Sequence, residues 1–278
     1  MTLTAQPAPA TDATADVLAI LVEAAVLAGA LVLPFFRHGE KTTAAIHSKA
    51  GGSPVTDADI LADRFLQEQL TRAFPQAGWL SEESVDDPAR LACRDVLIVD
   101  PIDGTRGFLN GDPRWTVCIA LVRDGRPIAG VVHAPALGET FAAGAGLGAT
   151  RNGVKVQTGT ARGLDGARVA GPHFFLEELA RNGIVPQAKI PSLAYRLVQV
   201  ADASLDVALA SHEARDWDIA AADLIVCEAG GTLLSLAQRQ PRYNRADTVH
   251  PVLVATTPAL VEPSLAAVRL AAHALGML

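Results

Sequence analysis

The feature that most constrains the fold is a short apolar run, VLIV, that two aspartates, Asp100 and Asp103, follow closely. A run of this length is typical of a buried strand, so both carboxylates are expected just past a strand end. Pro101 is expected to end that strand, and Gly104 permits a sharp turn with close backbone approach. Residues 105–110 are then expected to form one helical turn, whose first N–H groups are free.

These two aspartates have two interpretations. Carboxylates beside free backbone N–H groups suit a phosphate held through divalent metal ions, because hard cations prefer oxygen ligands and helix N-termini favour anions. Alternatively, the aspartates only cap a helix that follows a turn. The local sequence leaves both interpretations open.

The composition of the chain excludes some classes of function. The chain has 278 residues, of which 50% are apolar, so it can bury the core of one large domain or of two packed halves. A formal charge of −7 and the absence of any Lys or Arg cluster argue against a partner that is a nucleic acid polymer. Three widely spaced cysteines, Cys93, Cys118 and Cys227, are expected to be reduced thiols of a cytoplasmic protein.

The N-terminal region contains an apolar stretch, residues 17–36, which invites a membrane interpretation. Its longest uncharged part, residues 24–36, is shorter than the ~20 residues that a bilayer span needs, and no basic segment precedes it. We therefore expect no membrane contact and a mostly buried helix, with Asp12 or Thr14 as its N-cap. Residues 1–11, rich in Ala, Pro and Thr, are expected to form a disordered tail.

The pattern of elements divides the chain near residue 158. Residues 12–158 are expected to form an α+β half with an antiparallel sheet, because Asp124-Gly125 separates two strand-like runs as a hairpin turn does. Residues 159–278 alternate short strands with helices, which predicts an α/β half. The stretch 42–54 contains adjacent glycines and is expected to be a mobile loop.

Three further acids lie at the ends of predicted elements. Asp59 falls in the first turn of a helix capped by Thr56 or Asp57, Glu82 follows a strand-like segment, and Asp218 opens a helix that ends at Gly230. Each has an ordinary structural explanation when taken alone, since acids are favourable in a first helical turn.

Taken together, these sites resemble a known family. The motifs are VTDAD (55–59), SEES (81–84), DPIDGT (100–105), WDIAAAD (217–223) and EAGG (228–231), in this order. Their combination resembles the inositol monophosphatase superfamily. The resemblance implies a layered αβαβα sandwich of the inositol monophosphatase and fructose-1,6-bisphosphatase type, a homodimer, and phosphatase activity on a small phosphorylated metabolite.

The resemblance also implies roles for individual residues. The implied ligands of two or three Mg²⁺ ions are Glu82, Asp100, the carbonyl of Ile102, Asp103 and Asp218. Asp59 and Thr105, with Glu82 nearby, would orient and deprotonate the attacking water. The backbone N–H groups of Gly104 and Thr105 would hold the phosphate, and the C-terminal half would contribute Asp218 and residues of the substrate pocket.

Substrate choice depends on departures from the inositol phosphatase pattern. The candidate substrate residues are Lys49, Arg106, Arg196 and Asp216. Ser211 occupies the position where an inositol-contacting Glu is expected. Cations suit a second phosphate, because Arg binds phosphate oxygens bidentately.

These departures favour a 3′(2′),5′-bisphosphate nucleotidase acting on 3′-phosphoadenosine 5′-phosphate. The alternative is an inositol monophosphatase or a related polyol- or sugar-phosphate phosphatase, and the arginines then have a purely structural explanation as surface or ion-paired groups. A non-catalytic regulator that binds metal or phosphate is less consistent with the sequence, because all the implied ligands are present.

Overall fold

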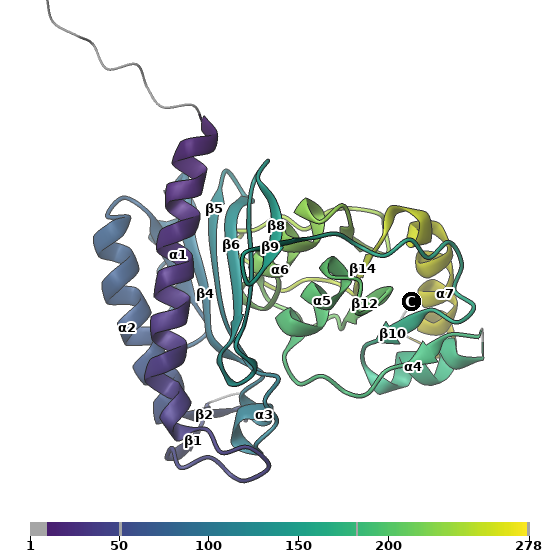
Figure 1. Cartoon of the computed structure of the whole chain (residues 1–278), viewed down its shortest axis with the longest axis horizontal. Helices are drawn as coiled ribbons and strands as arrows, with labels where there is room; N and C mark the ends of the chain where they lie inside the picture. Colours follow the sequence, from purple (N-terminus) through teal and green to yellow (C-terminus); the bar gives the residue numbers. More distant parts are fainter. Residues whose placement is uncertain (1–9, 50–51, 182, 277–278) are drawn as a thin grey trace, which may run out of the picture.

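The computed structural model describes residues 10–49, 52–181 and 183–276, which form five layers (Figure 1). Two helices cover a seven-stranded sheet, two more separate this sheet from a five-stranded sheet, and a final pair covers the far side. The predicted αβαβα sandwich is therefore confirmed.

The outer helices of the first half are α1 (Ala10–Val32) and α2 (Asp57–Ala73). Because α1 begins at Ala10, the predicted N-caps Asp12 and Thr14 are wrong: both lie inside the helix, as do the last two residues of the predicted tail. Residues 1–9 of that tail lie outside the described residues. The prediction for α2 is confirmed, and Thr56 is its N-cap.

The apolar helix α1 lies across the first sheet (Figure 1). The stretch Ala13–Phe35 is long and apolar enough to cross a membrane by length and composition, and 33% of its most apolar window is buried. Leu21, Ala25 and Ala28 are completely buried in the cluster that this helix shares with Leu97 of the sheet. Its inner face thus covers one side of the sheet.

The seven-stranded sheet has its strands in chain order from β3 to β9, antiparallel except for the parallel pair β3 and β4. The strands are β3 (Gly78–Ser81), β4 (Asp95–Asp103), β5 (Thr116–Arg123), β6 (Arg126–Ala134), β7 (Glu139–Gly144), β8 (Gly148–Arg151) and β9 (Val154–Val156). The predicted hairpin is confirmed between β5 and β6. Asp124 and Gly125 form its turn with φ of 50° and 73°.

The end of β4 differs from the prediction. Pro101 does not end the strand, which continues to Asp103. Instead, the pairing with β5 is irregular between Asp100 and Asp103, because the proline has no N–H to donate to the neighbouring strand. A short helix, α3 (Thr105–Leu109), follows as predicted.

The predicted mobile loop at 42–54 contains ordered structure. Strand β1 (Ile46–Ser48) pairs antiparallel with β2 (Pro54–Thr56), so the prediction of a loop across this whole stretch is wrong. All three β1 residues are exposed, so no alternation of apolar residues indicates the strand.

The second half contributes α5 (Leu193–Ala201) and α6 (Asp216–Glu228), which lie between the two sheets (Figure 1). Its sheet has the order β11-β10-β12-β14-β13. The strands are β10 (Arg168–Ala170), β11 (Val185–Pro186), β12 (Val207–Ala210), β13 (Thr232–Ser235) and β14 (Leu253–Thr256). Helices α4 (His173–Ala180) and α7 (Val261–Ala274) cover its outer face.

One hydrophobic cluster joins the two halves. It includes Phe141 of the first sheet, Leu197 of α5, Ile225 of α6 and Leu253 of the second sheet, all at most 1% exposed. Because α6 packs against β4, β5 and β6, its N-terminus lies beside the irregular end of β4. This packing determines where the site forms.

Candidate active site

Three acids from the two halves meet at the end of β4. One carboxylate oxygen from each of Asp100, Asp103 and Asp218 lies within 4.8 Å of the other two. The second oxygen of Asp100, Oδ2, is buried without a hydrogen-bond partner among the described residues. Buried carboxylates without partners are costly unless a cation satisfies them, so this donor set fits a hard divalent cation such as Mg²⁺.

The electrostatics of the trio agree with that fit. Burial, followed by the neighbouring charges of Glu82, Asp103 and Asp218, raises the pKa of Asp100 well above its ordinary value. Burial and then Asp103 likewise raise the pKa of Asp218. Burial raises the pKa of Asp103 to about 6, although hydrogen bonds from Ser192 and the following backbone oppose it. Each pKa is raised because the ionised forms are buried close to one another, and a bound cation would relieve that repulsion.

Asp103 and Asp218 are held by helix N-termini. Asp103 accepts hydrogen bonds from Ser192 Oγ at 2.5 Å and from the backbone N–H of Ala194 at 2.7 Å, both at the start of α5. Asp218, in the first turn of α6, accepts one from the backbone N–H of Arg215 at 2.7 Å. Backbone N–H groups at the two helix N-termini thus orient both carboxylates.

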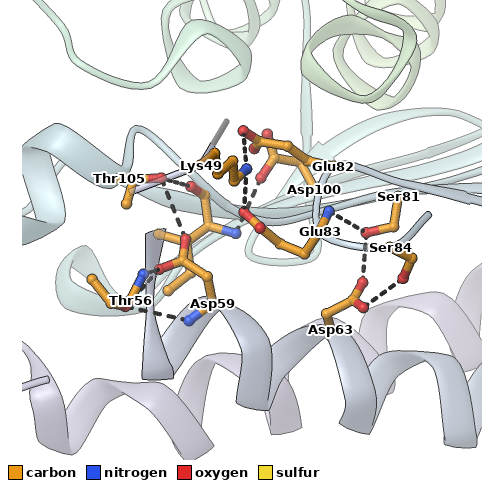
Figure 2. A network of polar contacts seen from close by, with 11 residues as sticks. Lys49, Thr56, Asp59, Asp63, Ser81, Glu82, Glu83, Ser84, Asp100 and Thr105 are labelled. Atoms are coloured by element: carbon orange, nitrogen blue, oxygen red, sulfur yellow. Dashed lines mark hydrogen bonds and ion pairs between the residues drawn. The ribbon is translucent and has the colours of Figure 1, made fainter. Parts of the chain in front are cut away.

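Lys49 joins two neighbouring acids (Figure 2). Its Nζ lies 2.8 Å from Glu82 Oε1 and 2.8 Å from Glu83 Oε1. Burial lowers the pKa of Lys49, but Glu82 and Glu83 outweigh this effect and the net pKa is raised. Burial raises the pKa of Glu83 to about 7. Glu82 is therefore near the trio, whose pKa values it raises, but its Oε1 is bonded to Lys49.

Asp59 and Thr105 lie together although they are far apart in the sequence (Figure 2). Thr105 Oγ1 is 3.3 Å from Asp59 Oδ1 and 3.0 Å from the carbonyl oxygen of Ile102. Asp59 Oδ2 accepts hydrogen bonds from the backbone N–H and the hydroxyl of Thr56 in a capping box. Burial raises the pKa of Asp59, while the bonds from Thr56 oppose that shift.

The candidate substrate residues have different environments. Arg106 is exposed on α3. Arg196 Nε is buried without a partner among the described residues; burial lowers the pKa of Arg196 to about 10, and the charges of Asp103 and Asp218 oppose this shift. The structure brings Arg196 to the acidic trio.

The environment of Asp216 differs from that expected of a residue that binds substrate. It is completely buried, and its oxygens accept hydrogen bonds from the backbone N–H of Asn244 at 2.9 Å and from His250 Nε2 at 2.7 Å. Through these two hydrogen bonds, the carboxylate of Asp216 holds the loop before β14 against the start of α6.

Sequence reasoning missed two residues of the site. Ser192 is the N-cap of α5, and a serine before a helical pattern is the available signal, but its bond to Asp103 depends on tertiary packing. Glu83 is adjacent to a predicted ligand and has no distinguishing local pattern. Its burial and its bond to Lys49 appear only in the structure.

Comparisons with known proteins agree with this geometry. Residues 13–273 match the model of the inositol monophosphatase family. A 3′(2′),5′-bisphosphate nucleotidase CysQ of Aggregatibacter actinomycetemcomitans is 29% identical over 84% of this chain and 90% of its own length. A histidinol-phosphatase of Chlorobaculum parvum is 34% identical over 80% of this chain and 87% of its own length.

A solved structure shows the same fold. The Thermotoga maritima IMPase superposes with a TM-score of 0.83 and 25% identity, covering 94% of this chain and 100% of that protein. The family match spans nearly all of the chain, and all three acids of the trio lie within it. The chain belongs to the inositol monophosphatase family and is a phosphatase of that family.

Proposed function

We propose that this chain hydrolyses a small phosphate monoester and depends on Mg²⁺. The observation that carries the proposal is the trio of buried Asp100, buried Asp103 and half-buried Asp218, with an oxygen on Asp100 that has no partner among the described residues. Glu82 and the carbonyl of Ile102 complete a donor set for two or three ions. When bound, Mg²⁺ supplies positive charge that offsets the charge on the phosphoryl oxygens during hydrolysis.

The chain itself positions the phosphate and the water. The backbone N–H groups of Gly104 and Thr105 bind the phosphate at the start of α3. Thr105 Oγ1 takes a proton from the attacking water and passes its own to Asp59, which is 3.3 Å away. The raised pKa of Asp59 supports this role, because it makes the carboxylate a stronger base than an ordinary aspartate.

The favoured substrate is 3′-phosphoadenosine 5′-phosphate. Arg196 supports it, because a buried guanidinium with a free Nε beside the trio suits a second phosphate group. Arg106 and Lys49 are further cations at the same end of the sheet. The CysQ relative is a nucleotidase by its name.

A second candidate is a monoester with one phosphate, of the polyol or sugar-phosphate kind. The histidinol-phosphatase relative, at 34% identity, favours a small phosphorylated alcohol. Arg196 would then serve only to balance the charge of the nearby acids.

Catalysis is tested by metal dependence. Asp103→Asn and Asp218→Asn are expected to lower kcat at least about a hundredfold, more than the ~10–100-fold typical of groups that only support a ligand. Asp206→Asn is the matched control, because this buried acid pairs with Arg168 outside the trio. Near-normal Mg²⁺-dependent rates in either trio variant would refute the site, and no phosphate release from any monoester would favour a non-catalytic regulator.

Substrate choice is tested by kcat/KM for 3′-phosphoadenosine 5′-phosphate, histidinol phosphate and inositol 1-phosphate. We expect the bisphosphate to be preferred, and Arg196→Gln to reduce kcat/KM for it by about tenfold or more while affecting the others less. A wild-type preference for either other ester would establish the second candidate.

We also propose that the chain is a cytoplasmic homodimer without membrane contact. The outer side of α1 exposes apolar side chains, among them Val26 at 40% and Leu27 at 48%, which a second copy can cover. Light scattering after size-exclusion chromatography should give twice the chain mass of 29.0 kDa. A monomer at micromolar concentration would contradict the dimer.

A further inference from the structure

A second cavity lies outside the acidic trio, in the C-terminal half. It has a volume of about 880 Å³ and is formed by the long segment between β13 and β14, together with α7 and the loop before α6. None of the trio residues lines it. Cavities of ~300–1,000 Å³ are the size of small-molecule sites.

The charge of this cavity is opposite to that of the whole chain. The cationic and imidazole side chains that line it are Arg239, Arg242, Arg245, Arg269, His212 and His250, and no carboxylate lines it. The chain as a whole carries a net charge of −7. Four guanidinium groups around one cavity repel each other, and an anion bound between them would relieve that repulsion.

Carboxylates do not neutralise these arginines. Within the described parts of the chain, the guanidinium groups of Arg242, Arg245 and Arg269 donate only to backbone carbonyls, at 2.5–3.1 Å. The side chain of Arg239 has no hydrogen bond or ion pair with any described residue. Several N–H donors therefore stay free to bind a ligand, since each guanidinium carries five.

Three acids close to this part of the chain have other hydrogen-bond partners. Asp216 is buried behind His250 and bonded to it, and Asp247 caps its own loop through the backbone N–H of Val249. Glu262 accepts a hydrogen bond from Gln238. Among the described residues, no carboxylate forms an ion pair with any of the four arginines.

The remaining walls are apolar. Leu236, Pro241, Val252 and Leu253 line the cavity beside the arginines. Such a mixture suits a ligand with an anionic end and an apolar or planar body, because guanidinium groups bind phosphate bidentately and also stack on flat rings.

We propose that this cavity binds an organic anion of nucleotide size, such as a nucleoside diphosphate, at a site separate from the acidic trio. The phosphates lie among the arginines, and the base lies on the apolar walls. The proposal does not rest on the phosphatase activity, because no residue of the trio takes part.

The test is calorimetric titration with ADP in the presence of EDTA, which prevents metal-dependent binding at the trio. We expect 1:1 binding with Kd below about 1 mM. Arg239→Glu should weaken it about tenfold or more, because a donor becomes a repelling charge. The control Arg72→Glu makes the same charge change on α2, where the exposed Arg72 pairs with Glu68 far from the cavity lining, and should leave Kd unchanged.

Two comparisons separate this site from the active site. Asp100→Asn should bind ADP as the wild type does, and adenosine, which lacks phosphate, should bind at least about tenfold more weakly. Absence of saturable ADP binding would overturn the proposal. So would equal Kd values for Arg239→Glu and Arg72→Glu, loss of binding in Asp100→Asn, or binding of a poly-glutamate peptide instead of ADP.

Discussion

Gly104 occupies a conformation and a space that suit only glycine. Its φ is +88°, and a Cβ added there would lie 2.9 Å from the backbone nitrogen of Ser192. The left-handed conformation is costly for a residue with a Cβ, and the contact is with rigid backbone. This close approach brings the start of α5 to Asp103.

We expect Gly104→Ala to reduce the free energy of unfolding by more than about 2 kcal/mol and to lower kcat/KM, because Ser192 must move away from Asp103. Gly138→Ala is the control, since Gly138 also has positive φ, +64°, but nothing lies within 4 Å of its added Cβ. Urea unfolding and initial rates measure both effects. Equal losses in the two variants would show that the close approach is unimportant.

Ser192 is a positioning residue for the proposed metal site. Removing its hydroxyl takes one of the hydrogen bonds from Asp103, so Ser192→Ala should raise the Mg²⁺ concentration for half-maximal activity by about tenfold. Ser264→Ala should leave it unchanged, because the buried Ser264 hydroxyl has no partner among the described residues. An unchanged Mg²⁺ requirement in Ser192→Ala would contradict the role.

At the scale of elements, α6 serves two purposes. Its first turn presents Asp218 to the trio, and its third turn buries Asp223. Asp223 accepts a hydrogen bond from the Tyr243 hydroxyl at 2.8 Å, which fastens the segment between β13 and β14 to the helix. Burial raises the pKa of Asp223 to about 6, while the bonds from Tyr243 and Cys227 oppose that shift.

This raised pKa predicts a pH dependence of stability. An unfolded aspartate keeps its ordinary value of 3.8, so between that pH and about 6 the folded state binds more protons than the unfolded state. The free energy of unfolding therefore falls as pH rises through this window, by roughly 3 kcal/mol from this group. Asp223→Asn lacks this contribution.

The measurement is urea unfolding of the wild type and Asp223→Asn at pH 4 and pH 7. The stability of the variant relative to the wild type should rise by about 2–3 kcal/mol between the two pH values. Other titrating groups cancel in this difference. A difference that does not depend on pH would mean that Asp223 is ionised in the folded protein throughout this range.

At the scale of the whole molecule, Arg90 joins the two halves. It is 2% exposed and comes from the 3₁₀ helix at Pro88–Ala92. Its guanidinium pairs with Asp86 and also donates to Asn244 Oδ1 at 2.8 Å and to the carbonyl of Arg245 at 3.1 Å. The latter contacts reach the long segment before β14.

Arg90→Ala should reduce the free energy of unfolding by about 2–4 kcal/mol, because it removes a buried side chain and leaves its acceptors in both halves without their donor. Arg94→Ala is the control: the Arg94 and Asp124 side chains are 71% and 69% exposed, so its loss should cost no more than about 0.5 kcal/mol. Thermal or urea unfolding measures the loss of stability in each variant. Similar stabilities would show that Arg90 does not hold the halves together.

Individual elements around the acidic site could be predicted from local pattern, whereas the layered fold and the roles of the acids followed from the resemblance of the motifs to the family. The buried strand that contains the run VLIV, the hairpin at Asp124 and the helix capped by Thr56 depend on short-range rules, and the structure contains all three. The errors fall where those rules are weak. Pro101 lies inside β4, where the pairing with β5 is irregular, instead of ending the strand. The exposed strand β1 has no alternation of apolar residues that would predict it.

The sequence by itself indicated an α+β half followed by an α/β half, because strand patterns and turn residues are local. The order of its motifs resembled a known family, and that resemblance implied the layered fold and the acids expected to hold metal. Only the tertiary structure decided that Ser192 orients Asp103, that Asp216 faces His250, and that four arginines surround a separate cavity. These contacts join segments far apart in the chain, and a local pattern carries no information on which distant side chain will be its partner.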